Sequence, residues 1–473
     1  MHEALQKRLR ELPSVEELVG SMPVAALLAR FSRVQVVDAV RAAVEEERGT
    51  ILAGEARAEA AGGGGLTETL LTRAAALLEA WSRPGLRRTL NLSGVVIHTN
   101  LGRSRLAEPA IERVAEVARS YGNLEYDLEA GARGHRETHV ERLLTRITGA
   151  EAAFAVNNNA GAVLLLLMGL AAGKRVIVSR GQLVEIGGSF RLPDIMRAGG
   201  VELVEVGTTN RTRIEDYEAA ITSDTALLLR VHTSNYRIMG FTEEVSLEEL
   251  VTLGRGRGVP VADDLGSGAL LELDVFAGEP TVAASLRAGV DLVCFSGDKL
   301  MGGPQAGILL GSAEVVSRLR RHPVARALRL DKMTLAALEA TLLLYTDPER
   351  ARREIPTLRL LARTPAETAA LAARLQNAIE ARCPDGFILE VEESTAQAGG
   401  GSMPLVELPS HAVRVRTLRL SAAALEAELR RAPVPVIARI SQDCLYLDVH
   451  ALDEAEVEEA ADSVAWAAAR LPG

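Results

Sequence analysis

The sequence is poor in lysine, although it is rich in basic residues. Of 53 Lys and Arg residues only four are lysines, namely Lys7, Lys174, Lys299 and Lys332. Arginine has therefore replaced lysine over most of the surface. An enzyme that depends on a lysine amine has very few candidates in this chain.

Cysteine is also scarce, and its spacing matches no metal site. Cys294, Cys383 and Cys444 lie far apart, which excludes a disulfide framework and is typical of a reducing cytosol. The eight histidines show no metal-ligand spacing either, so we expect no metal.

Long apolar runs are absent. The longest, 160–172, is shorter than the ~20 residues that a membrane-spanning helix needs. The first residues mix charges and lack an apolar signal core, so we expect a cytoplasmic protein without membrane contact. The net charge of −10 excludes a uniformly basic nucleic-acid binder, but it leaves room for a local basic patch.

The beginning of the chain reads as a separate helical module. Residues 1–61 show amphipathic helical spacing, and glycines occupy all four positions of 62–65. A capped helix is expected over 67–82. We therefore predict a helical N-terminal domain over 1–61, followed by a glycine joint and linker helix over 62–90.

From residue 150 onward, short β-branched or aliphatic runs alternate with helical stretches. Such alternation predicts an α/β large domain, over 91–346, with a mostly parallel seven-stranded sheet covered on both faces. Ligands bind at the carboxyl ends of such strands. The expected strands are 153–157, 175–179, 201–206, 226–231, 259–264, 292–296 and 307–310.

The remaining residues, 347–473, predict a small α+β domain. Helices are expected over 365–382 and 454–470. The expected strands are 387–391, 405–408, 413–417, 436–440 and 444–449.

Three strand ends carry candidate chemistry. The first leads into Asn158, Asn159, Ala160 and Gly161 at the start of an apolar helix, where free amides favour a phosphate; a simple N-cap is the alternative. The fifth ends in Asp264, whose carboxylate suits the pyridine nitrogen of pyridoxal phosphate (PLP), although it equally suits a turn before the glycines that follow.

The sixth strand is followed by Ser296 and, three residues later, Lys299. The serine suits the cofactor phosphate, and a desolvated lysine amine suits the Schiff base; a surface lysine in a turn is the alternative. A phosphate cradle, then Asp264, then Lys299 is the order found along aspartate-aminotransferase-like (fold type I) PLP enzymes, which this chain resembles.

Longer strings make the resemblance specific. They are IHTNLGR at 97–103, NLEYDLEAGARG at 123–134, EIGG at 185–188, RLP at 191–193, SGDKLMGGPQAG at 296–307 and RALRLDK at 326–332. On these strings the chain resembles the bacterial selenocysteine synthases, the L-seryl-tRNA(Sec) selenium transferases, essentially from end to end.

The resemblance implies site residues and partners. Lys299 would hold PLP, and Asp264 would pair with its pyridine nitrogen. Ser296 together with residues 158–161 would bind its phosphate. The selenophosphate donor would be bound by Arg103, Arg326 and Arg329, although the last two also suit an ordinary exposed helix pair. Asp298 would assist proton transfer or orient the seryl ester. The family also implies a homo-oligomer built as a ring of dimers, a decamer.

The implied reaction converts seryl-tRNA(Sec) to selenocysteinyl-tRNA(Sec) through a tRNA-bound aminoacrylate. One alternative is a PLP lyase or transferase acting on a free small amino acid, and another is a non-enzymatic RNA-binding protein. For His98 the sequence leaves two roles open, packing within the fold or lining the active site. Residues 232–237 should face the cofactor, but the sequence assigns neither their roles nor the residue that stacks on the PLP ring.

Overall fold

The computed structural model describes residues 2–53, 65–186, 190–276, 278–383, 386–404, 406–417 and 421–470. The chain divides into two compact units, Met1–Arg88 and Thr89–Gly473, and each is considered by itself. Within the described residues, no helix combines the length and the apolar character that crossing a membrane would require.

The first unit is helical. Ser14 and Ser32 begin two of its helices with capping boxes, in which the serine and the third residue of the helix satisfy each other's free amides. Its elements are α1 (His2–Arg10), α2 (Val15–Val19), α3 (Val24–Leu28), α4 (Arg33–Leu52) and α5 (Leu66–Ser82).

Helix α5 belongs to this unit, although the sequence suggested a linker helix over 62–90. Leu70, Ala74 and Leu78 of α5 form one buried cluster with Val36 and Val40 of α4. Burial of this apolar face, which sequence reasoning left unpartnered, is what makes α5 part of the module. Of the expected glycine joint, 62–64 lie outside the described residues.

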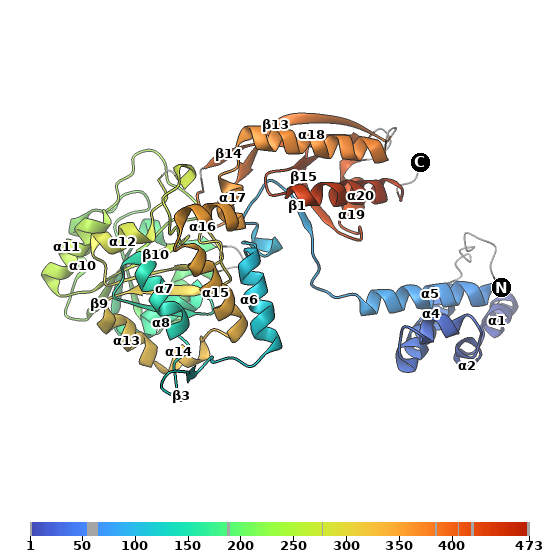
Figure 1. Cartoon of the computed structure of the whole chain (residues 1–473), viewed down its shortest axis with the longest axis horizontal. Coiled ribbons are helices and arrows are strands. Elements are labelled where there is room, and N and C mark those ends of the chain that lie inside the picture. Colours follow the sequence, from blue (N-terminus) through green and yellow to red (C-terminus); the bar gives the residue numbers. More distant parts are fainter. Residues whose placement is uncertain are drawn as a thin grey trace. The chain divides into compact units, whose positions relative to one another are not determined.

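The second unit contains the predicted seven-stranded sheet, two of whose strands, β9 and β10, are labelled in Figure 1. The strand order is β4-β12-β11-β10-β9-β5-β8. All neighbouring pairs are parallel except those of β12, which is antiparallel to both β11 and β4. The mostly parallel seven-stranded sheet is thereby confirmed. Its strands are β4 (Ala152–Val156), β5 (Arg175–Ser179), β8 (Glu202–Val206), β9 (Thr225–Val231), β10 (Val261–Gly266), β11 (Leu292–Ser296) and β12 (Gly307–Gly311).

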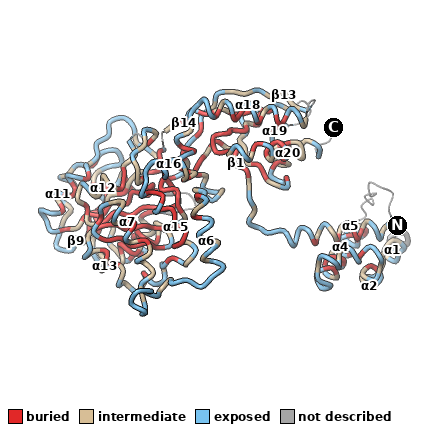
Figure 2. The backbone as a smooth tube through the Cα atoms, in the orientation of Figure 1, coloured by how far each residue is buried: buried red, intermediate tan, exposed pale blue. Residues whose placement is uncertain are grey.

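Side chains alternate between two buried layers along these strands. Val293 and Phe295 enter one apolar cluster, whereas Leu292 and Cys294 enter the other. Buried residues gather in the interior of the unit, around α7 and α15, whereas α6 at its edge is largely exposed (Figure 2). The first cluster is shared with α7 (Thr138–Thr148), α10 (Ile214–Ala220), α11 (Leu247–Arg257), α12 (Val282–Ala288) and α15 (Lys332–Leu344), and the second with α8 (Asn159–Ala171), α9 (Leu192–Ala198), α13 (Ala313–Arg321) and α14 (Pro323–Ala327).

A five-stranded sheet follows, in the order β1-β15-β16-β14-β13. Its members are β1 (Leu90–Leu92), β13 (Phe387–Gln397), β14 (Glu407–Thr417), β15 (Val436–Ser441) and β16 (Cys444–Asp448). Helices α18 (Pro365–Arg382), α19 (Ala422–Leu429) and α20 (Val457–Ala468) bury their apolar sides with these strands. The C-terminal α+β part thus forms as predicted.

Two details of this sheet differ from the sequence prediction. The runs expected at 405–408 and 413–417 form one strand, β14, whose ladder with β13 continues through Pro409; Leu405 lies outside the described residues. Strand β1 was not foreseen, and it pairs in parallel with β15. Residues at the start of the predicted large domain therefore complete the C-terminal sheet.

Shorter elements complete the unit. Two antiparallel pairs are β2 (Tyr126–Asp127) with β3 (Ala132–Arg133), and β6 (Glu185–Ile186) with β7 (Phe190–Arg191). Further helices are α6 (Glu108–Arg119), α16 (Pro348–Glu354) and α17 (Pro356–Leu361). Single 3₁₀ turns are η1 (Thr99–Leu101), η2 (Arg180–Gln182), η3 (Asp274–Phe276) and η4 (Glu454–Glu456).

Candidate active site

A pocket of about 250 Å³ opens at the carboxyl ends of β4, β9, β10 and β11. These four strands run in the same direction, so residues that follow them meet at one edge of the sheet. The lining residues are Arg103, Asn158, Asn159, Ala160, Val184, Val231, His232, Ser234, Asp264, Gly266, Ser296, Asp298, Lys299 and Gln305.

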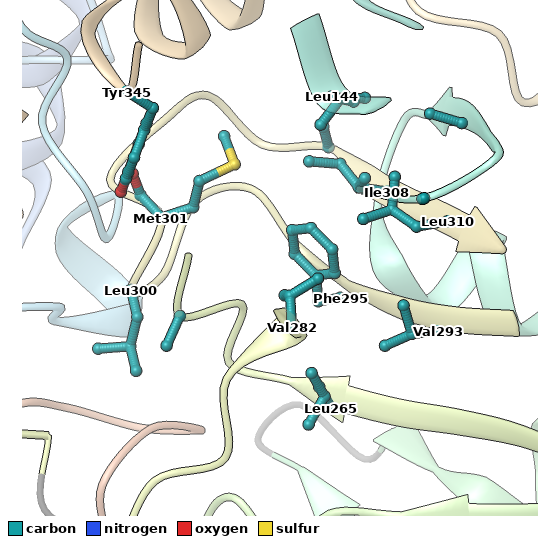
Figure 3. Packing of buried hydrophobic residues seen from close by; sticks show 14 of the residues in the cluster. Leu144, Leu265, Val282, Val293, Phe295, Leu300, Met301, Ile308, Leu310 and Tyr345 are labelled. Carbon is teal, nitrogen blue, oxygen red and sulfur yellow. The ribbon is translucent and has the colours of Figure 1, made fainter. Parts of the chain in front are cut away.

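Lys299 lies in this pocket with only 4% of its surface exposed. The next two residues, Leu300 and Met301, are anchored in the apolar core, and the Tyr345 hydroxyl donates to the Met301 carbonyl at 2.7 Å (Figure 3). Ser104 donates to the Lys299 carbonyl at 2.9 Å. The backbone at and just after Lys299 is therefore fixed by the hydrogen bonds from Ser104 and Tyr345.

The amine donates a hydrogen bond to the Gly401 carbonyl at 3.2 Å. Burial lowers the pKa of the Lys299 amine below its ordinary value, and the positive charge of Arg103 lowers it further. A larger fraction of the amine is thus neutral and nucleophilic at a given pH than for an exposed lysine.

Adjacent aspartates of β10 point to opposite faces of the sheet. Asp263 is fully buried, where it pairs with Arg230 at 3.0 Å and accepts from Ser285 at 2.6 Å, so its role is structural. Asp264 lines the pocket and accepts from the Asn159 side-chain amide at 2.8 Å. Burial raises the pKa of the Asp264 carboxyl, while the Asn159 hydrogen bond opposes that rise.

The start of α8 lies at the edge of the pocket. Asn158, Asn159 and Ala160 line the pocket. The Asn158 side chain caps the helix by accepting from the Gly161 amide at 2.8 Å, so that amide is already used, and Gly161 is not among the lining residues. A Cβ at Gly161 would lie 2.9 Å from the Asn157 side-chain oxygen, so close packing explains this glycine.

Arg103 and Asp298 form an ion pair inside the pocket, with Nη1 at 2.7 Å from Oδ2. Arg326 and Arg329 instead line a second hollow of about 580 Å³, and this hollow shares no lining residue with the Lys299 pocket. Arg329 lies 3.9 Å from Glu125 there. Within one chain, the structure therefore does not bring the three predicted donor-binding arginines together.

Sequence reasoning missed the contact between the glycine turn and Lys299. Gly401 was taken only as part of a turn, yet a Cβ at this position would lie 2.5 Å from the Lys299 amine nitrogen. The cluster of three glycines at 399–401 was the available signal. His232 and Ser234 line the pocket, as the expectation for 232–237 implied. His98 is not among the lining residues, and its Nδ1 is buried without a hydrogen bond.

The described residues contain no group of three or more His, Cys, Asp or Glu side chains arranged to hold a metal ion. The polar side chains that line the pocket are an amine (Lys299), a guanidinium (Arg103), two carboxylates (Asp264 and Asp298), an imidazole (His232), three amides (Asn158, Asn159 and Gln305) and two hydroxyls (Ser234 and Ser296).

Two family models match the chain. One, described as L-seryl-tRNA selenium transferase, matches residues 89–453, and the other, described as selenocysteine synthase N terminal, matches residues 9–48. Together they extend over both compact units.

Known proteins agree with these models. An L-seryl-tRNA(Sec) selenium transferase of Geotalea uraniireducens (strain Rf4) is 50% identical over 93% of this chain and 95% of its own length. One of Moorella thermoacetica is 54% identical over 81% of this chain and 82% of its own length.

A solved D-glucosaminate-6-phosphate ammonia-lyase shares the fold. Its TM-score is 0.56 at 21% identity, and the match covers 81% of this chain and 96% of that chain. At this level of identity the likeness concerns the fold alone. Together with the sheet order, it confirms the predicted α/β fold class of the large domain.

Proposed function

The chain belongs to the L-seryl-tRNA selenium transferase family, and from that premise we propose that the Lys299 pocket is its active site. The activity is the conversion of L-seryl-tRNA(Sec) to L-selenocysteinyl-tRNA(Sec), a PLP-dependent transfer in selenocysteine biosynthesis. The observation that carries the placement is the buried lysine amine facing the pocket beside a buried carboxylate.

The residues of the pocket fit PLP. The amine of Lys299, with a lowered pKa, would hold the aldehyde carbon. Asp264 would face the pyridine nitrogen, whose positive charge offsets the cost of burying this carboxylate. The amides at the start of α8 and the Ser296 hydroxyl would hold the phosphate. Bound there, PLP supplies an electron sink for the pair left at the serine Cα.

The chain's own groups then act on the substrate. Lys299, with its Nζ free, would take the proton from the serine Cα. Asp298, held by Arg103, keeps negative charge next to that nitrogen and stabilises its protonated form. The glycine turn at 399–401 lies against the lysine, and the burial of Lys299 would limit the access of water to the reaction.

We propose selenophosphate as the selenium donor, bound by Arg103, Arg326 and Arg329. Forked guanidinium groups bind tetrahedral polyanions by paired hydrogen bonds. Since Arg326 and Arg329 line a different hollow from Arg103 in one chain, we propose that a second copy supplies them. This arrangement agrees with a homo-oligomer assembled as a ring of dimers, a decamer.

The first unit is proposed to bind the tRNA. Its support is the match of residues 9–48 to the selenocysteine synthase N-terminal model, together with a core that is independent of the pocket. Because the substrate is an aminoacyl-tRNA, we also propose that the enzyme acts in the cytoplasm. The alternative substrate, a free small amino acid, needs no such appendage.

The test is the first half-reaction. Purified PLP-loaded protein should dehydrate seryl-tRNA(Sec) without any donor and leave free serine unchanged. Equal turnover of free serine would overturn the tRNA-directed function.

The donor site has its own test. Arg326→Ala or Arg329→Ala should leave dehydration intact and raise the selenophosphate requirement roughly tenfold or more, since a charge-assisted hydrogen bond contributes about 1.5–3 kcal/mol. Loss of dehydration with unchanged donor affinity would instead assign these arginines to the seryl ester or the tRNA end.

A further inference from the structure

His232 lines the active-site pocket, and neither the PLP fit nor the donor site uses it. It follows β9 directly, and its backbone amide donates to the Asp264 carbonyl at 2.9 Å. The ring is thereby held at the strand edge, in the same pocket as Asp264 and Lys299.

A buried carboxylate lies behind this imidazole. Glu279 Oε1 is 3.5 Å from His232 Nε2, and only 4% of the Glu279 side chain is exposed. Its other oxygen accepts from the Met403 amide at 3.3 Å, next to the glycine turn that contacts Lys299. Glu279 is therefore fixed by the backbone on one side and faces the imidazole on the other.

Glu279 keeps its negative charge despite its burial. Burial is the largest effect and raises the pKa of this carboxyl, but the interactions with His232, Ser267 and the Met403 amide together outweigh it, and the net pKa lies below its ordinary value. Oε1 of this carboxylate, 3.5 Å away, is the group that faces Nε2 of the ring. Nδ1 is then the ring nitrogen left for a ligand in the pocket.

The proposed reaction needs a second proton-transfer group. Lys299 takes the Cα proton, while the serine hydroxyl must be protonated in order to leave as water. Asp298 is engaged by Arg103, and Asp264 by Asn159. Apart from Lys299, the imidazole is thus the pocket group that is suited to carry a proton to the substrate.

We propose that His232, positioned by Glu279, is the acid that protonates the departing serine hydroxyl; this inference rests on the function proposed above. The Cβ–O bond breaks with its electron pair on oxygen, Nδ1 gives its proton to that oxygen, and water leaves. The ring becomes neutral and regains a proton from solvent before the next turnover. Glu279 is a positioning residue that stabilises the protonated ring.

The experiment compares two leaving groups on the same tRNA, in full-length PLP-loaded protein. With seryl-tRNA, His232→Asn should slow dehydration about 100-fold or more, the usual loss when a general acid is removed. With β-chloroalanyl-tRNA, whose chloride leaves without a proton, the same variant should lose less than about tenfold. Binding of seryl-tRNA should not change, and added imidazole should partly restore dehydration by His232→Ala.

Glu279→Gln should also dehydrate seryl-tRNA more slowly while sparing the chloride substrate, with a smaller loss of rate than His232→Asn. It serves as the comparison if His232→Asn fails to hold PLP. His139→Asn is the matched control, because this half-buried histidine lies outside the pocket, with Nε2 at 3.2 Å from the Leu124 carbonyl. Equal losses on both substrates, or no loss, would overturn the role of His232. If the unaltered protein fails to dehydrate seryl-tRNA, the proposed function itself fails.

Discussion

Arg103 donates a hydrogen bond to Asp298 at 2.7 Å, directly beside the buried lysine. Arg103 has a left-handed backbone, with φ of 62°, and its amide donates to the His98 carbonyl. A residue other than glycine in this conformation is strained unless its surroundings hold it there. The segment before the large sheet, which carries Arg103, thus places one positive charge beside Lys299.

This charge leads to a prediction on pH dependence. Arg103→Gln should raise the pKa of Lys299, since burial and Arg103 both lower it and the freed Asp298 carboxylate would favour the charged amine. The pH curve for covalent PLP attachment, followed by absorbance, should therefore move to higher pH. If the curve moves by about one pH unit, attachment at neutral pH slows about tenfold, because a tenfold smaller fraction of the amine is neutral.

Arg105→Gln is the control for that movement of the curve, because Arg105 pairs with Asp453 at 3.0 Å and is not among the pocket-lining residues. A curve that stays in place in Arg103→Gln would show that Arg103 has no electrostatic effect on the lysine.

The identity of the reactive lysine can be tested directly. Lys299→Ala should abolish both the borohydride-reducible PLP adduct and turnover. Lys332→Ala should keep both, because Lys332 donates to the carbonyls of Val117 and Ser120 at the end of α6 and so has a structural role. A PLP adduct found by mass spectrometry on Lys174 or Lys332 would contradict the assignment.

The glycine turn near the lysine gives a steric prediction. At Gly401, φ is +84° and an added Cβ would lie 2.5 Å from the Lys299 amine nitrogen. Gly401→Ala should therefore weaken covalent PLP attachment about tenfold or more, through about 1 kcal/mol of backbone strain and displacement of the amine.

Gly400→Ala is the matched control in the same turn, because its Cβ would meet only the Thr99 side-chain oxygen, at 3.1 Å. Equal PLP affinity in the two variants, measured by titration of the apoprotein, would show that the turn does not position the lysine.

The helical unit yields a prediction on substrate binding. Removal of residues 1–88 should leave PLP attachment unchanged, because every lining residue of the pocket belongs to the second unit. Affinity for seryl-tRNA(Sec), measured by filter binding, should fall at least tenfold if the unit contacts the tRNA. Unchanged affinity would assign tRNA recognition to the second unit.

Local patterns were sufficient for much of this molecule. The strand over 292–296 and the helix over 365–382 were predicted with the observed bounds, because continuous apolar runs and a Thr-capped helix start are encoded within a few residues. The placement of Asp264 and Lys299 in one pocket also followed from strand order, since parallel strands end at the same edge.

What the sequence by itself determined, then, was the class of fold, the family and the residues at the strand ends. Only the tertiary structure decided that β1 joins the C-terminal sheet and that Gly401 reaches Lys299 across 102 positions of the chain. It also separated Arg326 and Arg329 from Arg103. Those relationships depend on packing between segments that are far apart in the sequence. The free energies of loop closure and of apolar burial that fix such packing are not encoded in any local run of residues.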